Sequence, residues 1–206
     1  MVACVSTLDH LVVAAADLQE GSRWVEERLG VGLEAGGRHA SFGTHNRLLS
    51  LGPDSYLEVI AVDPEAPPPP RPRWFELDGP AMRERLGAGP ALVHWVVRVD
   101  SVDGITDPLE LRRGDNRWVI GVPPDGRMPL SGLAPSRILW RTPPPATLLP
   151  DKGIRLAELR LSTGEPAAVT DAVAGVSGPV VVVEGPPGLS ATFDTSTGPV
   201  EMGHVR

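Results

Sequence analysis

The sequence has a single cysteine, Cys4, so no disulfide can form within the chain. It contains no run of lysine and arginine, and no apolar run approaches the ~20 residues that a membrane-spanning helix needs. No secretory leader pattern opens the chain, and the net charge is −7. We therefore expect a cytoplasmic protein in a reducing compartment, with neither nucleic acid nor a membrane as its partner.

Several common catalytic patterns are also missing. There is no phosphate-binding loop, no glycine-rich dinucleotide fingerprint and no nucleophile elbow. Cys4 shows no partner for nucleophilic work, so we assign it no role. Glycine and proline, in contrast, are abundant at 23 each among 206 residues, which favours short strands and turns over long helices.

The organising pattern is an apolar strand that carries one histidine, and it occurs twice. The stretches 8–13 (LDHLVV) and 92–97 (LVHWVV) coincide in their apolar positions and in their histidines, His10 and His94. A third, weaker copy starts at 156–159 (LAEL), with Glu158 at the histidine position. Internal repetition of this kind predicts structural units of similar build.

The first copy opens a strand, a helix and three further strands. A strand over 8–16 is followed by Asp17 and, three residues on, Glu20, which is the pattern of a capped helix start. Gly30 marks the end of that helix. Strands are then predicted at 38–42, 47–51 and 56–62, with a turn at 43–46.

The later copies predict a similar order. A proline-rich stretch and a short helix at 80–86 lead to strands at 92–99, 109–112, 117–122 and 138–141, with barely a helical turn at 101–107. The tail predicts a strand at 154–161, a helix at 165–174 and strands at 180–183, 189–194 and 199–202. We expect a first unit at 1–64, a linker at 65–90, a second unit at 91–142 and a third at 143–206.

Repeated strand-helix-three-strand units, opened by strands with a polar residue, resemble the vicinal oxygen chelate superfamily. Its members include glyoxalase I, extradiol dioxygenases and bleomycin-resistance proteins. The likeness is carried by 8–13, by 17–30 and by 56–60 (YLEVI), while 43–48 and 116–144 are similar to the glyoxalase-like domain group. The resemblance implies an α+β fold in which βαβββ units form a curved mixed sheet around a cavity, with helices on the outer face.

The resemblance also implies a divalent metal in that cavity. Carried onto matching positions, its ligands would be His10, Glu58 and His94, while the fourth carboxylate of the glyoxalase I pattern has no counterpart near 138–140. Strand alternation places His10 and Glu58 on the concave side if the helix covers the other face. A Zn, Ni, Mn, Mg or Fe ion there would act as a Lewis acid on two neighbouring substrate oxygens. The alternative is that the histidines are hydrogen-bonded core or pocket residues and that Glu58 pairs with an arginine such as Arg47.

Further candidates surround the same cavity. His45 and Asn46, at the predicted turn, can donate to a substrate carbonyl or act as acid and base. The alternative is a solvated His45 and an Asn46 that supplies the backbone angle of the hairpin. Candidate substrate-binding residues are Tyr56, on the concave face, Arg98, which can reach a substrate carboxylate or lie at the surface, and Trp140, which lines the cavity or fills the core.

The sequence thus predicts a protein that acts on a small oxygenated molecule, and it leaves three alternatives open. The first is a metal-dependent lyase, isomerase or dioxygenase. The second is a metal-free protein of the bleomycin-resistance type that binds a drug or metabolite in an apolar cavity. The third is an interaction module whose cavity is filled by side chains. Homodimers are common in the superfamily, and the third unit favours one here.

Overall fold

The structure is a computed structural model that describes residues 6–205, so Cys4 lies outside the described residues. Its first part has the expected order of one strand, one helix and three strands. The elements are β1 (Ser6–Ala14), α1 (Leu18–Leu29), β2 (Glu34–His39), β3 (Thr44–Ser50) and β4 (Tyr56–Val62).

The middle and the end of the chain continue with strands and short helical turns. The middle holds η1 (Trp74–Glu76), α2 (Pro80–Gly87), β5 (Ala91–Arg98), η2 (Val102–Gly104), β6 (Pro108–Arg113), β7 (Asn116–Gly121), η3 (Pro129–Gly132), β8 (Ser136–Trp140) and η4 (Pro145–Thr147). The end holds β9 (Arg155–Thr163), α3 (Pro166–Ala172), β10 (Val176–Ser177), β11 (Val180–Glu184), β12 (Gly188–Thr195) and β13 (Gly198–Val205). Within residues 6–205, no helix is both long enough and apolar enough to cross a membrane.

Helix α1 forms where the sequence predicts it because its capping signals are satisfied. The Asp17 side chain accepts a hydrogen bond from the backbone N–H of Glu20 at 2.9 Å. At the other end Gly30 adopts a left-handed φ of 71°, which ends the helix. The side chains of Val25 and Leu29 are buried, so this helix presents its apolar face to the sheet.

The turn after β2 lies earlier than predicted. Gly43 has a φ of 56°, which suits glycine, and the chain enters β3 directly after it. Thr44 then pairs with Val62 and Asn46 with Ile60, so the predicted turn residues 44–46 belong to a strand. The turn signal was correct, but glycine marks its last residue and not its first.

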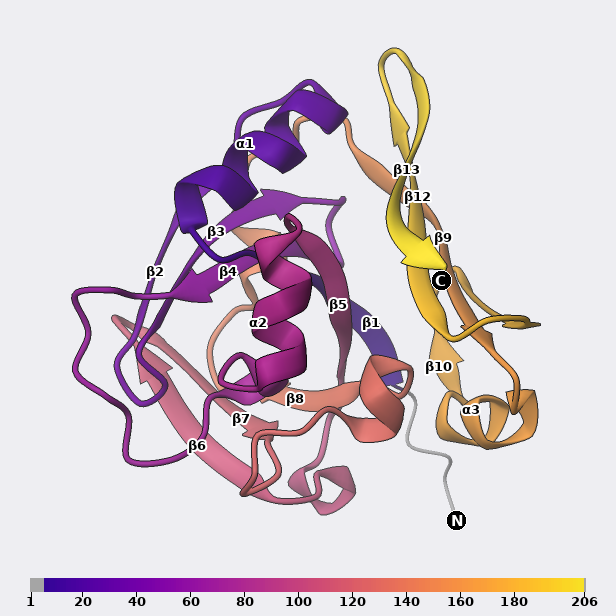
Figure 1. The fold of residues 1–206 in the computed structure, drawn as a ribbon. Helices are drawn as coiled ribbons and strands as arrows, with labels where there is room; N and C mark the ends of the chain where they lie inside the picture. The colour runs from indigo at the N-terminus through magenta and orange to yellow at the C-terminus, as the bar shows by residue number, and fades with distance from the viewer. Residues whose placement is uncertain (1–5, 206) are drawn as a thin grey trace.

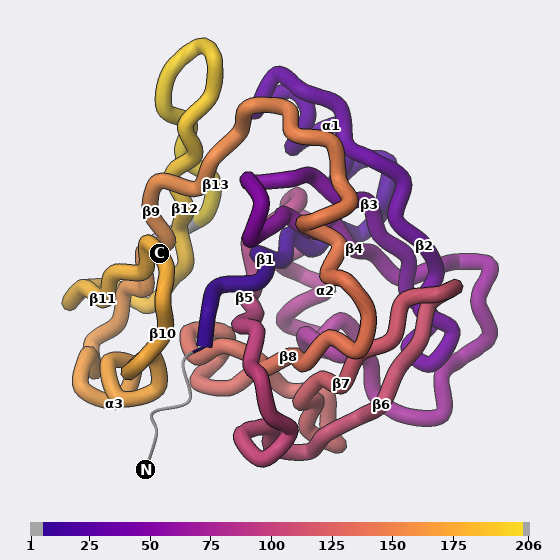
Figure 2. The backbone as a smooth tube through the Cα atoms, turned by 180° about the vertical axis from the view of Figure 1, so that it is seen from behind, coloured from indigo at the N-terminus to yellow at the C-terminus, as the bar shows by residue number. Residues whose placement is uncertain are grey.

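The larger sheet joins the first two units into one curved surface. Its order is β2-β3-β4-β1-β5-β8-β7-β6, with β10 beside β1. Strand β1 is parallel to β4 and antiparallel to β5, and β5 is parallel to β8. The end strands β2 and β6 contact each other, so the sheet is nearly a barrel (Figure 2). The predicted α+β fold with a curved mixed sheet is confirmed.

The outer face of this sheet is covered by α1 and by a second sheet of order β11-β9-β12-β13 (Figure 1). The second unit has only the short turn η2 where the first has a helix. The four-stranded sheet packs against β5 and buries Trp95 completely. Their common core contains Val25, Leu57, Leu92, Trp95, Leu159, Leu161 and Phe193.

The pairing within the smaller sheet differs from that of the first two units. Strands β1 and β5 are each parallel to the last strand of their unit, whereas β9 is parallel to β11 and antiparallel to β12. Glu158, at the third histidine-equivalent position, pairs with Arg160 at 2.6 Å on β9. The order of elements therefore repeats, while the topology does not.

The inner face of the larger sheet is covered by the segment 74–87, which contains η1 and α2. In α2 the side chains of Met82 and Leu86 are buried. The inner core contains Val12, Ile60, Trp74, Phe75, Met82, Leu86, Val96, Trp118 and Ile138. This arrangement leaves a small polar cavity between the sheet and its cover.

Candidate functional site

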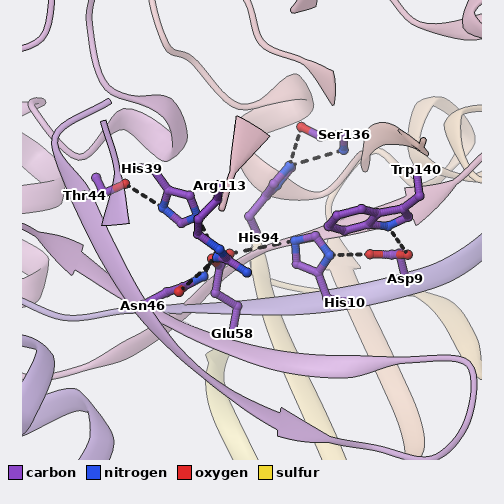
Figure 3. A network of polar contacts seen from close by, with 10 residues as sticks. All are labelled: Asp9, His10, His39, Thr44, Asn46, Glu58, His94, Arg113, Ser136 and Trp140. Atoms are coloured by element: carbon purple, nitrogen blue, oxygen red, sulfur yellow. Dashed lines mark hydrogen bonds and ion pairs between the residues drawn. The ribbon is translucent and has the colours of Figure 1, made fainter. Parts of the chain in front are cut away.

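A cavity of about 30 Å³ lies inside the curved sheet. That volume holds about two water molecules, so the site is nearly filled by its own side chains. Polar groups from both halves of the sheet meet there (Figure 3). The lining residues are His10, His39, Asn46, Tyr56, Glu58, Trp74, Phe75, Arg113, Trp118, Ile120, Ile138 and Trp140.

His10 and Asp9 form a buried pair at the start of this site. The Nδ1 atom of His10 lies 2.7 Å from Oδ1 of Asp9. Neighbours in a strand normally point to opposite faces, but here the pairing of β1 with β5 slips. Leu8 pairs with Val97 and His10 with Val96, so Asp9 is the additional residue of a β-bulge. The bulge turns the Asp9 carboxylate toward the His10 ring.

Asp9 has two further partners, which allow a carboxylate to be buried there. Its Oδ2 accepts a hydrogen bond from Nε1 of Trp140 at 3.0 Å and lies 3.6 Å from Nη1 of Arg98. Because the carboxylate accepts, it holds a proton on Nδ1 of His10 and leaves Nε2 as the ring nitrogen that faces Glu58. The His10 ring also stacks on Tyr56, with centroids 4.6 Å apart.

Glu58 faces His10 across the cavity. Its Oε2 lies 3.8 Å from Nε2 of His10, and its Oε1 accepts a hydrogen bond from Nδ2 of Asn46 at 2.5 Å. The Asn46 amide is oriented by its other contacts, because Oδ1 accepts from the backbone N–H of Gly37 at 2.8 Å and from Arg113 at 3.1 Å. Asn46 therefore connects a carboxylate on one side with a guanidinium on the other.

Arg113 reaches this site from β6, at the far end of the sheet. Its Nη1 also donates to Nε2 of His39 at 2.9 Å, and Nδ1 of His39 lies 3.1 Å from Oγ1 of Thr44. His39 is thus a neutral ring that accepts at Nε2 and donates at Nδ1. Burial, aided by the nearby Arg113 charge, holds the pKa of His39 well below 6.5. Gly37 has no side chain and leaves room for the Arg113 stem.

His94 is directed at Ser136 (Figure 3). Its Nε2 accepts from the backbone N–H of Ser136 at 3.2 Å and lies 2.9 Å from the Ser136 hydroxyl. Burial lowers the pKa of His94 to about 3. Of the three predicted metal ligands, only His10 and Glu58 face each other. In the described part of the chain, no three His, Cys, Asp or Glu side chains are grouped to hold a metal ion.

The remaining predicted site residues separate into two groups. Asn46, Tyr56 and Trp140 line the cavity, and burial raises the pKa of the Tyr56 hydroxyl well above its ordinary value, with the Asp9 and Glu58 charges adding to the shift. His45 precedes Asn46 in β3, so alternation places it on the other face of the sheet. Arg98 contacts Asp9 and does not line the cavity.

Sequence reasoning missed three residues of the site: Asp9, His39 and Arg113. Neighbouring residues in a regular strand point to opposite faces, so the sequence predicts that Asp9 points away from the cavity that His10 faces. Only a β-bulge reverses this, and the sequence carries no clear bulge signal at this point. His39 was placed in a predicted strand but given no role. Arg113 precedes the turn 114–116, and nothing local indicates that it crosses to the other end of the sheet.

The chain matches the model of the glyoxalase-like domain family over residues 8–176. It therefore belongs to this family, within the vicinal oxygen chelate superfamily. The match includes both histidine-bearing strands and every cavity-lining residue. A search of curated proteins found no match to the chain.

Solved structures share the fold at low sequence identity. A hypothetical protein from Staphylococcus aureus is 12% identical, with 97% of this chain and 85% of that chain covered and a TM-score of 0.54, which shows the fold alone. Methylmalonyl-CoA epimerase from Mycobacterium tuberculosis is 19% identical, with 68% and 91% covered and a TM-score of 0.39. A hypothetical protein from Bacillus halodurans is 16% identical, with 66% and 93% covered and a TM-score of 0.42.

Proposed function

We propose that this glyoxalase-like protein is an enzyme that moves a proton on a small oxygenated molecule, as an isomerase or lyase does. One observation carries the proposal. The Asp9–His10 pair directs Nε2 of His10 toward a small cavity lined by polar and aromatic side chains, with the Glu58 carboxylate 3.8 Å away. A positioned imidazole is the usual group for general acid–base catalysis.

The proposed step is proton abstraction next to a carbonyl group. The substrate C–H bond breaks, its proton goes to Nε2 of His10, and the electron pair moves onto the carbonyl oxygen. The imidazolium that forms lies between Asp9 and Glu58, two carboxylates that stabilise its charge. Returning the proton to another atom, or expelling a leaving group, completes an isomerisation or an elimination.

The metal-dependent form of this function stays a prediction. His10 and Glu58 supply two donors, whereas a catalytic zinc site uses three protein ligands, and Nε2 of His94 is bound by Ser136. The residues do not fit a three-ligand centre, so we assign no step to a metal. Metal analysis of the purified protein tests this directly. Near-stoichiometric metal that is lost in both His10→Ala and Glu58→Ala would support the metal-dependent form.

The proton-transfer proposal predicts deuterium exchange that depends on His10. In D₂O the protein should catalyse deuterium uptake into at least one of a panel of 2-oxo acids and 2-oxo aldehydes, followed by NMR. His10→Gln should abolish the exchange. Asp9→Asn should slow it by roughly 10²- to 10⁴-fold, because the neutral amide no longer fixes the reactive tautomer.

His45→Gln is the matched variant for this assay. The sequence predicts His45 as a catalytic residue, whereas the structure places it on the opposite face of β3. Exchange that survives His45→Gln and disappears in His10→Gln would support the proposal. Exchange that is lost with His45 and retained without His10 would show that it is wrong.

A second candidate is a metal-free binding protein, favoured by the aromatic walls of the cavity. Trp74 stacks on Phe42 with centroids 4.1 Å apart, and the Trp118 and Trp140 rings lie 5.5 Å apart. A cavity of about 30 Å³ would have to open before either a 2-oxo acid or a drug-sized molecule could enter, and the drug needs the larger opening. Thermal stabilisation by hydrophobic drugs, without exchange on any oxygenated probe, would favour this function.

A further inference from the structure

Arg113 carries a charge that no carboxylate of the described residues pairs with. Its two acceptors, Nε2 of His39 and Oδ1 of Asn46, are both neutral and both contact Nη1. Within residues 6–205, its Nε and Nη2 atoms have no hydrogen-bond partner. Other arginines near the site differ, because Arg98 lies beside Asp9 and Arg73 pairs with Asp78 at 2.7 Å.

The surroundings of Arg113 suit an anionic ligand. The residue is half-buried and lines the cavity, where a guanidinium is costly unless an opposite charge lies nearby. Asn46 stands between Arg113 and Glu58 and binds the carboxylate through Nδ2, so Glu58 does not occupy the free donors. His39, held neutral, adds no competing positive charge.

We propose that the ligand of this cavity is a small carboxylate whose anionic group binds the free edge of Arg113. The planar guanidinium fork matches a carboxylate with two parallel hydrogen bonds. In a 2-oxo acid bound this way, the carbon that loses its proton lies on the other side of the carbonyl group from the carboxylate. This carbon would extend toward Nε2 of His10. The part of this inference that involves His10 rests on the proposed function. The anion site itself is inferred from the contacts of Arg113 alone.

Paired probes test the charge requirement. Pyruvate and pyruvamide have nearly the same shape, but only pyruvate is anionic. Binding is measured by the fluorescence of the tryptophans, three of which (Trp74, Trp118 and Trp140) line the cavity. The wild-type protein should bind pyruvate more tightly than pyruvamide. Arg113→Met and Arg113→Gln should weaken pyruvate binding by about 10- to 100-fold and remove the preference.

Arg112→Met is the matched control. Arg112 is the preceding residue of β6, is exposed, and carries the same charge. Its substitution should leave the preference for pyruvate intact. Arg113→Gln keeps a side-chain donor for Asn46, so it guards against a simple folding defect. Equal binding of the two probes, binding of neither, or a preference that survives both Arg113 variants would overturn the inference.

The outcomes for the anion site and for the proposed function are separable. His10-dependent deuterium exchange that proceeds equally on pyruvate and pyruvamide would overturn the anion requirement and leave proton transfer standing. A preference for pyruvate that is lost in Arg113→Gln, without exchange on any probe, would establish the anion site and overturn the enzymatic function.

Discussion

The histidines of this protein differ in state because their partners differ. His10 lies between two carboxylates, Asp9 at 2.7 Å from Nδ1 and Glu58 at 3.8 Å from Nε2. His39 accepts from a guanidinium and His94 from a backbone N–H, so both are held as neutral rings. The imidazoles of His10, His39 and His94 therefore have three different environments, and of these only that of His10 suits proton transfer.

The neutral state of His94 predicts an acid-sensitive stability. Its pKa is about 3 in the folded protein and 6.5 in an unfolded chain, so between these values the unfolded chain binds more protons. The contribution of His94 to the free energy of unfolding should thus be constant above about pH 6.5. Below that pH it should fall by roughly 1.4 kcal/mol per pH unit. His39, whose pKa is also lowered, acts in the same direction.

Urea unfolding between about pH 7 and pH 5 checks this prediction. His94→Gln keeps an acceptor for Ser136 but cannot take up a proton at these pH values. The slope of its unfolding free energy against pH should therefore be smaller than that of the wild type, by the contribution of about one bound proton. An unchanged slope in His94→Gln would contradict the assignment.

At the scale of single residues, the sequence identified the side chains whose position follows from alternation. Glu58 and Tyr56 line the cavity because they alternate with core residues in β4, and His10 lines it because it pairs with Tyr56 on the neighbouring strand. It missed Asp9, which depends on a bulge, and Arg113, which depends on contact between strands that are distant in the sequence. Local patterns contain neither kind of information.

Among the elements, β2 is shaped by two glycines. Its pairing with β3 jumps from Ala35–Arg47 to Arg38–His45, which leaves Gly36 and Gly37 in an irregular segment. The Gly36 backbone lies directly against Asn46, so there is no space for a side chain. The glycine pair thus allows Asn46 to reach both Arg113 and Glu58.

This close approach predicts that Gly36→Ala is harmful. The added methyl group would overlap Oδ1 and the carbonyl of Asn46 and should cost about 1–3 kcal/mol of stability. It should also displace Asn46 from Glu58 and lower any His10-dependent exchange. Thermal unfolding and the exchange assay measure the two effects.

Gly87→Ala provides the comparison. Gly87 ends α2, and an added methyl group there would meet no atom within 4 Å. The substitution should be neutral or stabilising by up to about 1 kcal/mol, because alanine favours helix. Equal destabilisation by Gly36→Ala and Gly87→Ala would argue against the steric explanation.

The cover of the cavity is conformationally unusual. Phe75 and Glu76 both have a φ of 57°, a backbone region that costs side-chain-bearing residues about 1–3 kcal/mol each. The backbone N–H of Glu76 donates to the carbonyl of Gly126 at 3.0 Å, which helps to hold this shape. The sequence predicted the helix that follows but could not predict this turn, since neither residue favours a positive φ.

For the whole molecule, the smaller sheet takes the place of the missing helix of the second unit. It shares one apolar core with the larger sheet and α1. The sequence predicted the order of elements in the tail but not its packing, because apolar strands do not specify which face they cover. The unit boundaries at 64, 90 and 142 and the homodimer stay predictions, and analytical ultracentrifugation measures the latter.

A shared core predicts a single cooperative unfolding transition. Leu159 of β9 is fully buried in this core, so Leu159→Ala should cost about 2–5 kcal/mol. Leu148 is 69% exposed, and Leu148→Ala should change little. In Leu159→Ala the signals from secondary structure and from tryptophan should shift together in a denaturant titration. Separate transitions would show that the two sheets fold independently.

The larger sheet is a barrel that is not fully closed. Among the described residues no backbone ladder joins β2 to β6, and Arg113 spans the gap with side-chain hydrogen bonds to His39 and Asn46. Widening the gap would break those bonds and leave every strand ladder intact. The residue that we expect to hold the ligand therefore also joins the two ends of the sheet through its Nη1 atom, so that an anion on Nε and Nη2 would add to these contacts and help to keep the gap narrow.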